Sequence, residues 1–207
     1  MKWFLRNWTD IVYALWEHIA ISLTALTIAF ALSLVIGLVA ARRERLYGAV
    51  MTVSGILYTI PTLAFLAFLI PLVGLGRTNA IITMVAFSLM ILIRSVATGI
   101  REVPAEVIDA ARGMGMSAAQ IMRRIELPLA LPVIVAGLRV SAVTVISVTV
   151  VAAYVNAGGL GTLIFNGIAS DHPAKIWAGA LTACALAVSV DLLLALLERQ
   201  LKRRRAA

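Results

Sequence analysis

The chain of 207 residues is 62% apolar and 14% charged, and its mean hydropathy is +1.00. Because soluble domains carry about 45–50% apolar and about 25% charged residues, this composition indicates a membrane protein and leaves no length for a separate soluble domain. The formal net charge of +8 comes from arginines that cluster just outside apolar runs, a pattern of membrane topology rather than of nucleic-acid binding, and the single cysteine, Cys184, excludes an intramolecular disulfide and a cysteine-rich metal site.

The first 18 residues mix aromatic and charged side chains. The aromatic residues are Trp3, Phe4, Trp8, Tyr13 and Trp16, and the polar ones include Asp10, Glu17 and His18. Because such amphipathic aromatic stretches favour the headgroup layer, we expect residues 1–18 to form an interfacial segment. A lone histidine is no evidence of a metal ligand set, so no metal site is predicted.

Five stretches are long and apolar enough to span a membrane, which takes about 20 residues per helix. They are residues 19–40, 49–73, 79–100, 129–153 and 177–197. Residues 19–199 are therefore expected to form one all-α transmembrane domain, followed by a basic tail at residues 200–207. Pro61 lies near the middle of the second span, where its missing N–H should kink the helix and either form a hinge or only shape the bundle.

Residues 101–128 form the longest charged insert between the spans. Ala110 and Ala111 contribute to a small, mildly apolar helix face, and Gly115 follows where this first short helix should end. Such a face and turn suit docking into a groove of a peripheral protein. An ordinary connecting loop is the alternative.

A second short helix is expected within the same insert. The sequence Ser117-Ala-Ala-Gln120 has the spacing of a capping box, which starts a helix. Pro128 is expected to end that helix before the fourth span begins.

A glycine-rich stretch follows the fourth span. Gly158, Gly159 and Gly161 interrupt helical structure, whereas Leu160 and Phe165 remain apolar. Since non-helical backbone at membrane depth survives only where protein or water covers it, we expect a short loop or half-helix tucked into the mouth of the bundle. A plain surface turn is the alternative.

Three ionisable residues lie within the spans: Arg94, Arg139 and Asp191. Arg94 is near the inner end of the third span, so its side chain can snorkel outward. Arg139 and Asp191 lie at comparable depths, and because unpaired charges there are costly, we expect a structural ion pair within one subunit or, as the alternative, a substrate-contacting role.

Lysines and arginines are distributed unequally on the two sides of the spans. Loop 41–48 holds three, segment 101–128 four and the tail after residue 198 five, against four at Lys2, Arg6, Arg77 and Lys175. By the positive-inside rule, the N-terminus is predicted outside and the C-terminus in the cytoplasm.

The charged insert resembles the signature of permease subunits of binding-protein-dependent ABC importers: Glu-Ala-Ala, three residues, Gly, nine residues, Ile-x-Leu-Pro. The one departure is aspartate in place of the usual glutamate. The residues on this signature are Asp109, Ala110, Ala111, Gly115, Ile125, Leu127 and Pro128.

The resemblance extends over most of the chain and is greatest to the small permeases of osmoprotectant importers, which carry glycine betaine, carnitine, choline or proline betaine. The stretches that resemble them are residues 58–64, 70–76, 157–161 and 191–199.

This resemblance implies a type I ABC importer permease fold with five transmembrane helices in a bacterial inner membrane. It implies a subunit without catalytic residues or bound cofactor, because ATP and Mg²⁺ belong to partner ATPases. The implied partners are a second permease subunit (the same or a related chain), two ATPase subunits and an extracytoplasmic substrate-binding protein.

The resemblance also implies roles for particular residues. The seven signature residues, within region 104–125 and just after it, would dock the ATPase. The residues Tyr154, Asn156, Gly158, Gly159 and Gly161 are candidates for an outer gate or a binding-protein contact. Tyr58 and Pro61 are candidates for the pathway or a hinge, since aromatic faces attract quaternary ammonium groups, while packing or interfacial anchoring is the alternative.

Other functions stay open. A permease for methionine or another amino acid shares the five-span size and a similar glycine-rich loop. An ion-coupled secondary carrier would usually show internal repeats and more intramembrane acidic groups. A membrane enzyme would need clustered carboxylates or histidines, whereas His18 and His172 are far apart in the sequence. A non-transporting scaffold is a further alternative.

Overall fold

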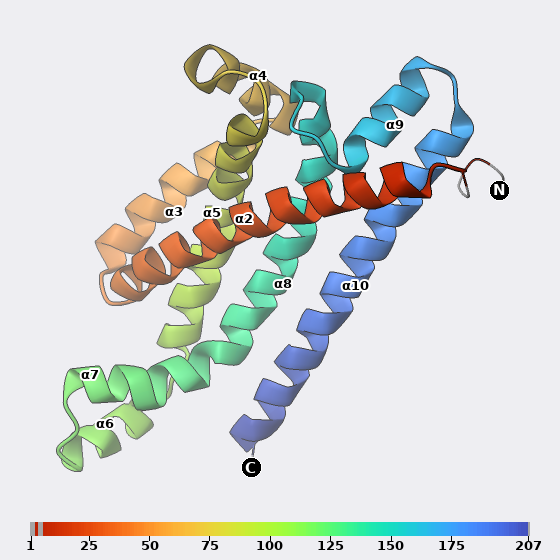
Figure 1. Ribbon diagram of the computed structural model, residues 1–207. Helices are drawn as coiled ribbons and strands as arrows, with labels where there is room; N and C mark the ends of the chain where they lie inside the picture. Colours follow the sequence, from red (N-terminus) through yellow and green to blue (C-terminus); the bar gives the residue numbers. More distant parts are fainter. Residues whose placement is uncertain (1–2, 4–5, 207) are drawn as a thin grey trace.

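The computed structural model describes residue 3 and residues 6–206, and within them it consists of helices and turns (Figure 1). Lys2 and Phe4 of the predicted N-terminal segment and Ala207 of the predicted tail lie outside the described residues. The elements are α2 (Trp8–Ala41), α3 (Glu44–Thr59), α4 (Thr62–Val73), α5 (Arg77–Arg101), α6 (Ala105–Gly113), α7 (Ala118–Ile121), the π-helix η1 (Met122–Glu126), α8 (Leu127–Ala152), the 3₁₀ turn η2 (Ala153–Val155), α9 (Leu160–Ala169) and α10 (Pro173–Ala206).

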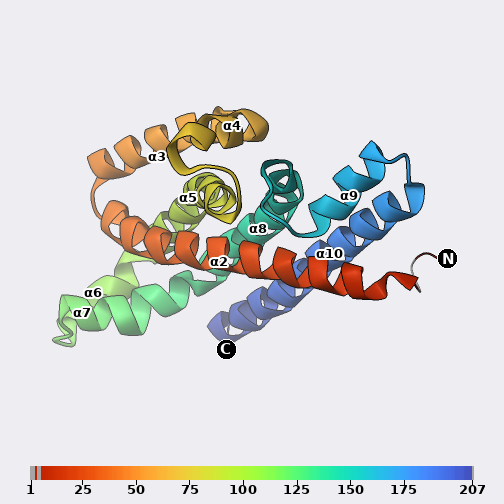
Figure 2. The ribbon, with the colours of Figure 1, turned by 45° about the horizontal axis from the view of Figure 1, so that its top comes forward.

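The bundle is centred on α2, α5 and α8. Helix α2 crosses obliquely in front of the other two, α10 runs along α8, and α3 and α4 lie along the outside of α5 (Figures 1 and 2). The buried face of α2 carries small residues at helical spacing, among them Ala25, Ala29, Ser33 and Ala40. Small side chains allow helix backbones to approach closely, which is how helices associate in a membrane without a strong hydrophobic driving force.

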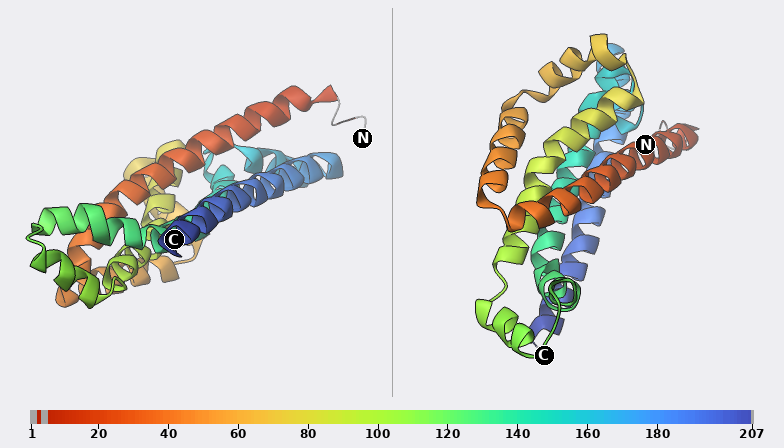
Figure 3. Two further views of the ribbon diagram at one scale, coloured as in Figure 1. Left: turned by 90° about the horizontal axis from the view of Figure 1, so that it is seen from below. Right: turned by 90° about the vertical axis from the view of Figure 1, so that its left-hand side faces the viewer.

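The two ends of the bundle are distinct. One end carries α6 and α7, which project from the bundle, and the C-terminus of α10 lies at the same end (Figure 3). The other end carries α9 and the beginnings of α2 and α10 (Figure 1). These are referred to as the α6–α7 end and the α9 end.

Within the described residues, four helical stretches are long and apolar enough to cross a membrane, and the bent pair of α3 and α4 makes five if the two count as one span. The chain is therefore a multi-pass membrane protein, and each of the five predicted spans corresponds to one of these stretches.

The second predicted span, residues 49–73, is not a single kinked helix. Helices α3 and α4 meet at 98°, with Ile60 and Pro61 between them. Ile60 is extended, with φ −68° and ψ 128°, because the proline ring disfavours helical geometry in the preceding residue, and Pro61 has no N–H to continue the ladder. The proline thus breaks the helix instead of kinking it.

Pro128 does not end the second short helix of the insert, contrary to the sequence prediction. Residues 118–155 form one helical run through α7, η1, α8 and η2. In η1 the N–H of Leu127 bonds to the carbonyl of Met122, five residues earlier, and Pro128 then falls in the first turn of α8. A proline is tolerated in a first turn, and a π-helical segment accommodates the change in hydrogen-bond register.

The predicted boundaries at residues 18 and 199 are not structural breaks either. Helices α2 and α10 each contain 34 residues, or about 51 Å at 1.5 Å per residue, against about 30 Å of hydrocarbon. The N-terminal segment from Trp8 and the basic tail up to Ala206 are continuations of these helices, so both helices are long enough to extend beyond a bilayer or to cross it tilted.

Candidate functional site

The α6–α7 end is built around a sharp turn. Helix α6 ends where Gly115 adopts φ +80°, and the N–H of Met116 returns to the carbonyl of Ala111 at 3.1 Å. This is the Schellman pattern of helix termination, in which the residue with positive φ is usually glycine. No atom lies within 4 Å of a Cβ built at Gly115, so backbone conformation and not space requires glycine there.

The predicted capping box is present at the start of α7. The Ser117 hydroxyl accepts from the N–H of Gln120 at 3.4 Å, and the Gln120 side chain accepts from the N–H of Ser117 at 2.7 Å. Two backbone donors are thus satisfied within the motif, which fixes the direction in which α7 leaves the turn.

The seven signature residues divide between the surface and the core. Ala111 is fully buried, and Ile125 and Leu127 are half-buried. The exposed members are Asp109, Ala110, Gly115 and Pro128, and Asp109 pairs with Arg112 at 3.0 Å on the outer side of α6. Only the exposed members are available for contact with a partner. The docking role of this region stays a prediction.

An ion-pair cluster that the sequence analysis did not identify ties this end to the bundle. Arg42, just after α2, contacts the buried carboxylate of Glu126 in η1 at 2.7 Å. Arg101, at the end of α5, pairs with Glu44 at 2.9 Å and donates to the last carbonyls of α2, at Ala40 and Ala41. A cation is favourable at a helix C-terminus, so the ends of α2 and α5 and the start of α3 are held together. The sequence shows that these charged residues lie just outside the spans, but it does not show which of them pair.

The α9 end is organised by the glycine-rich loop. Asn156, Gly158 and Gly159 have φ of +61°, +93° and +83°, and α9 starts at Leu160, whose side chain is fully buried. The ten-residue apolar helix α9 packs against α10. This is the short half-helix that the sequence predicted, and the plain surface turn is excluded.

The first amides of α9 are bonded by side chains of α2. Glu17 accepts from the N–H of Gly159 at 3.2 Å, and the Nδ1 of His18 accepts from the N–H of Leu160 at 3.3 Å. The same carboxylate pairs with Arg77 at the start of α5. Helix α9 has no side-chain cap of its own, so α2 supplies the cap, and a carboxylate is favourable at this end of a helix dipole.

His18 is fixed in one tautomer by this arrangement. Its Nδ1 accepts a hydrogen bond, so its Nε2 carries the proton and donates to the carbonyl of Ile146 at 3.1 Å. The side chain is fully buried. Glu17 and His18 thus take part in contacts inside the bundle, and the interfacial location of residues 1–18 stays a prediction. Their partners lie 142 residues away in the sequence, where no local pattern could reveal them.

The other predicted gate residues lie around this cap. Gly161 contacts the end of α8 so closely that a Cβ would lie 2.0 Å from the carbonyl of Val150, so only glycine fits. Tyr154 is 71% exposed and makes an edge contact with Phe165 at 6.0 Å between ring centroids. The structure thus brings the predicted loop residues together with Glu17 and His18, and their gating role stays a prediction.

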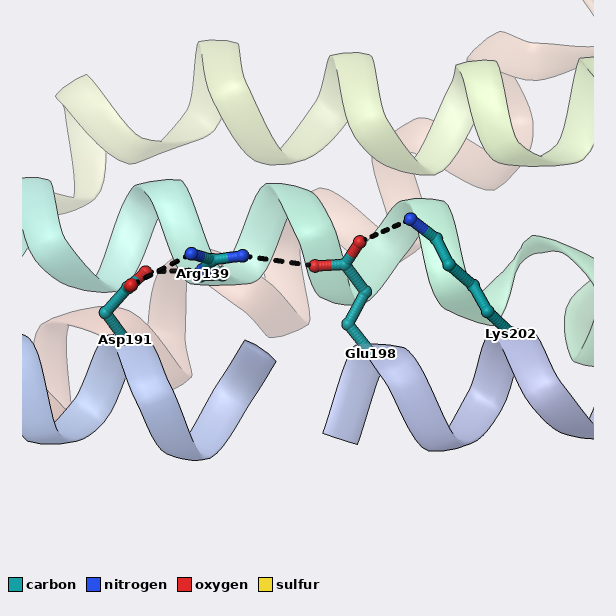
Figure 4. A network of polar contacts seen from close by, with 4 residues as sticks. All are labelled: Arg139, Asp191, Glu198 and Lys202. Atoms are coloured by element: carbon teal, nitrogen blue, oxygen red, sulfur yellow. Dashed lines mark hydrogen bonds and ion pairs between the residues drawn. The ribbon is translucent and has the colours of Figure 1, made fainter. Parts of the chain in front are cut away.

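The intramembrane pair predicted for Arg139 and Asp191 lies within one chain. Arg139 on α8 makes two hydrogen bonds to Asp191 on α10, one of 2.9 Å, and also contacts Glu198 at 3.5 Å (Figure 4). Glu198 in turn pairs with Lys202 at 2.6 Å. The four side chains form a line of alternating charge, in which Asp191, Glu198 and Lys202 are at helical spacing on α10.

Among the residues that the structure describes, no group of three or more His, Cys, Asp or Glu side chains is placed to hold a metal ion. The polar clusters instead join helices, and the chemistry available to them is hydrogen bonding and ion pairing.

Comparison with known proteins places the chain next to transport permeases. The family described as binding-protein-dependent transport system inner membrane component matches residues 33–203. The choline transport system permease protein of Bacillus subtilis and the carnitine transport permease protein of Listeria monocytogenes are each 37% identical over 201 residues, covering 97% of this chain and 93% and 92% of theirs. The osmoprotectant import permease protein of Salmonella typhimurium is 34% identical, covering 86% of this chain and 85% of its own.

Among solved structures, the fold matches inward-facing forms of the MetNI methionine ABC transporter. One of them has a TM-score of 0.82 at 24% identity and covers 92% of this chain and 95% of the matched chain. A second crystal form gives a TM-score of 0.80 at 23% identity. At this identity the likeness establishes the shared fold.

The α2 cap on α9 should stabilise the protein measurably. Replacing Glu17 by Gln removes the charge that serves both Arg77 and the Gly159 amide, and hydrogen bonds to charged groups contribute about 1.5–3 kcal/mol. We expect Glu17→Gln to lower the melting temperature in detergent by roughly 3–10 °C. Asp10→Asn, which removes an exposed carboxylate in the first turn of α2, is the control and should lower the melting temperature less, because only its interaction with the helix dipole is lost. Equal melting of the two variants would contradict the capping role.

The pair of Arg139 and Asp191 should show coupling between its members. Arg139→Gln leaves Asp191 without its partner, and Asp191→Asn leaves Arg139 with only its longer contact to Glu198, so each should melt lower than the double variant, and Arg139→Gln the more so. A charge-swapped pair is a poorer test, because an acidic side chain at position 139 would face Glu198. Simple addition of the two single effects would show that the residues are not energetically coupled.

Proposed function

Because the chain belongs to the family of binding-protein-dependent transport system inner membrane components, we propose that it is the permease subunit of an ABC importer for a small quaternary-ammonium osmoprotectant, such as glycine betaine, choline or carnitine. The observation that carries the substrate class is the 37% identity over 97% of the chain to permeases named for choline and carnitine. The methionine transporter shares the fold at 23–24% identity, which gives no support for methionine as the substrate.

The proposed orientation places the α6–α7 end in the cytoplasm and the α9 end outside, in a bacterial inner membrane. The support is the positive-inside rule, because arginines at positions 42, 43, 45, 112, 123 and 124 belong to segments at the α6–α7 end. The ion pairs described above hold these segments together there. The C-terminus then lies in the cytoplasm and the start of α2 outside.

The proposed assembly consists of two permease subunits, two ATPase subunits and an extracytoplasmic binding protein. ATP binding in the partners must favour one of two global states of the permease, since a ligand shifts an equilibrium only through its different affinities for the two states. We place the ATPase contact on the exposed surface of α6 and α7, around Asp109, Ala110 and Gly115. The permease then contributes no catalytic group of its own.

Two continuous connections would carry a movement of α6 and α7 into the membrane. One is the unbroken helical run from α7 through η1 to α8. The other is the contact between Arg42 and Glu126, which joins η1 to the end of α2. Helix α2 in turn reaches the α9 end, where Glu17 and His18 cap α9. A displacement at the ATPase contact would therefore reach the glycine loop through rigid elements.

The test is ATPase stimulation in proteoliposomes that contain the permease, its ATPase and its binding protein. We expect stimulation by glycine betaine, choline or carnitine and none by methionine. Stimulation by methionine alone would contradict the proposed substrate class. ATPase activity that does not depend on the permease would contradict the importer itself.

A matched pair of glycine variants tests the coupling region. Gly115→Val forces a β-branched residue to φ +80°, whereas Gly113→Val is helical, and neither Cβ meets another atom within 4 Å. Backbone strain of about 1–3 kcal/mol should reduce stimulated activity at least about five-fold in Gly115→Val, with little change in Gly113→Val. Equal activities would show that the geometry of this turn does not matter for coupling.

A further inference from the structure

Arg94 on α5 lies within a predicted span but makes no ion pair with the residues that the structure describes. The acidic groups at positions 17, 126 and 191 are ion-paired, but no carboxylate among the described side chains pairs with Arg94, which is exposed. It lies seven residues before the end of α5, or about 10 Å from Arg101 along the helix axis. A charged side chain at such a depth is costly unless it faces water, a ligand or a partner.

The Arg94 side chain lines a cavity on the side of α5 that faces α3. Side chains in an α-helix lean toward the beginning of the helix, which for α5 is the α9 end. Arg94 accordingly lines a cavity together with Met90 and Ile91, which are one turn closer to the beginning of α5. The expected snorkelling of Arg94 toward its own end of the membrane stays a prediction.

The same cavity contains an aromatic and a hydroxyl group. Its lining is completed by Tyr58 of α3 and Ser95, and its volume is about 220 Å³. Tyr58 is 43% exposed and is held by an edge contact to Phe87, with ring centroids 6.1 Å apart. The ring is thus positioned by Phe87, while the residue stays accessible from the cavity.

A second observation indicates that this face of the molecule is not exposed to lipid tails. The helix breaks at Ile60 and Pro61, directly after Tyr58, and Pro61 is exposed. Carbonyl groups freed by a broken helix at membrane depth are tolerated only where protein or water covers them. The broken helix and the unpaired arginine lie along the same α3–α5 face, and both are incompatible with lipid tails there.

We propose that the α3–α5 face lines the aqueous substrate pathway and that Arg94 binds the carboxylate of a zwitterionic quaternary-ammonium substrate while Tyr58 contacts its ammonium group. A guanidinium matches a carboxylate through two parallel hydrogen bonds, and an aromatic face attracts a quaternary ammonium group. This inference rests on the proposed osmoprotectant function and adds a selectivity. Arg94 favours betaine-type and carnitine-type zwitterions over choline, which has no carboxylate and is repelled by the arginine.

Uptake by the complete transporter in proteoliposomes tests the selectivity. In Arg94→Gln, uptake of glycine betaine should fall about ten-fold or more, whereas uptake of choline should stay within about two-fold of wild type or rise. Arg94→Lys keeps the charge but cannot form two parallel hydrogen bonds to a carboxylate, so its uptake of glycine betaine should lie between those of wild type and Arg94→Gln. Arg199→Gln, which removes an exposed arginine near the end of α10, is the matched control and should leave the uptake of both substrates unchanged. Equal losses for betaine and choline, or no loss for either, would overturn the carboxylate contact.

Variants of Tyr58 test the ammonium contact separately. Tyr58→Leu should lower the uptake of betaine and of choline alike. Tyr58→Phe, which keeps the aromatic ring, should take up both substrates at the wild-type level. Unchanged uptake of both substrates by Tyr58→Leu would show that Tyr58 is not part of the site.

A labelling experiment tests whether the α3–α5 face is exposed to water, and its result does not depend on which substrate is carried. In a Cys184→Ala background, Arg94→Cys should react with a membrane-impermeant, charged methanethiosulfonate, because thiolates form in water and not among lipid tails. Val35→Cys, at an exposed apolar position of α2 at comparable depth, should stay unlabelled. If the cysteine at position 94 is labelled no more than the cysteine at position 35, the inference is overturned, even if the transporter carries osmoprotectants. Labelling at position 94 in a transporter that carries no quaternary-ammonium compound would instead refute the proposed substrate and leave the aqueous face standing.

Discussion

The need to pair every charge that lies within or against an apolar bundle governs this structure. Glu17 is paired with Arg77, Glu126 with Arg42, and Asp191 with Arg139, and each pair joins elements that are far apart in the sequence. Leaving a buried charge without its partner costs more than the pair contributes, so these contacts fix which helices lie together. Small residues on α2 then allow the backbones to approach closely, and apolar packing fills the remaining space.

The same pairs hold α2 at both of its ends. At one end Glu17 and His18 cap α9, and at the other Arg42 holds the π-helix next to α7. In the proposed importer, a helix held at both ends in this way would carry a displacement from the α6–α7 end to the α9 end. Arg94 departs from the pairing rule, and a departure of this kind is expected where a membrane protein meets water or its substrate.

The sequence predicted local features well, but it predicted poorly where helices end. The five apolar stretches, the capping box at Ser117 and the interruption by glycines at 158 and 159 are confirmed, since each depends on residues a few positions apart. Pro61 and Pro128 were misjudged in opposite directions. The first breaks its helix and the second is absorbed in a first turn, because the effect of a proline depends on whether the neighbouring backbone needs the missing N–H.

The sequence by itself determined that this is an all-helical membrane protein of a permease family, because hydrophobicity, charge asymmetry and a spaced signature are properties of the linear chain. It also proposed Arg139 and Asp191 as partners from their depths alone. Only the tertiary structure decided that Glu17 and His18 cap α9, that Arg42 pairs with Glu126, and that Arg94 lines one cavity with Tyr58. Those relations join residues up to 142 positions apart, and they arise from the packing of helices, which no local pattern encodes.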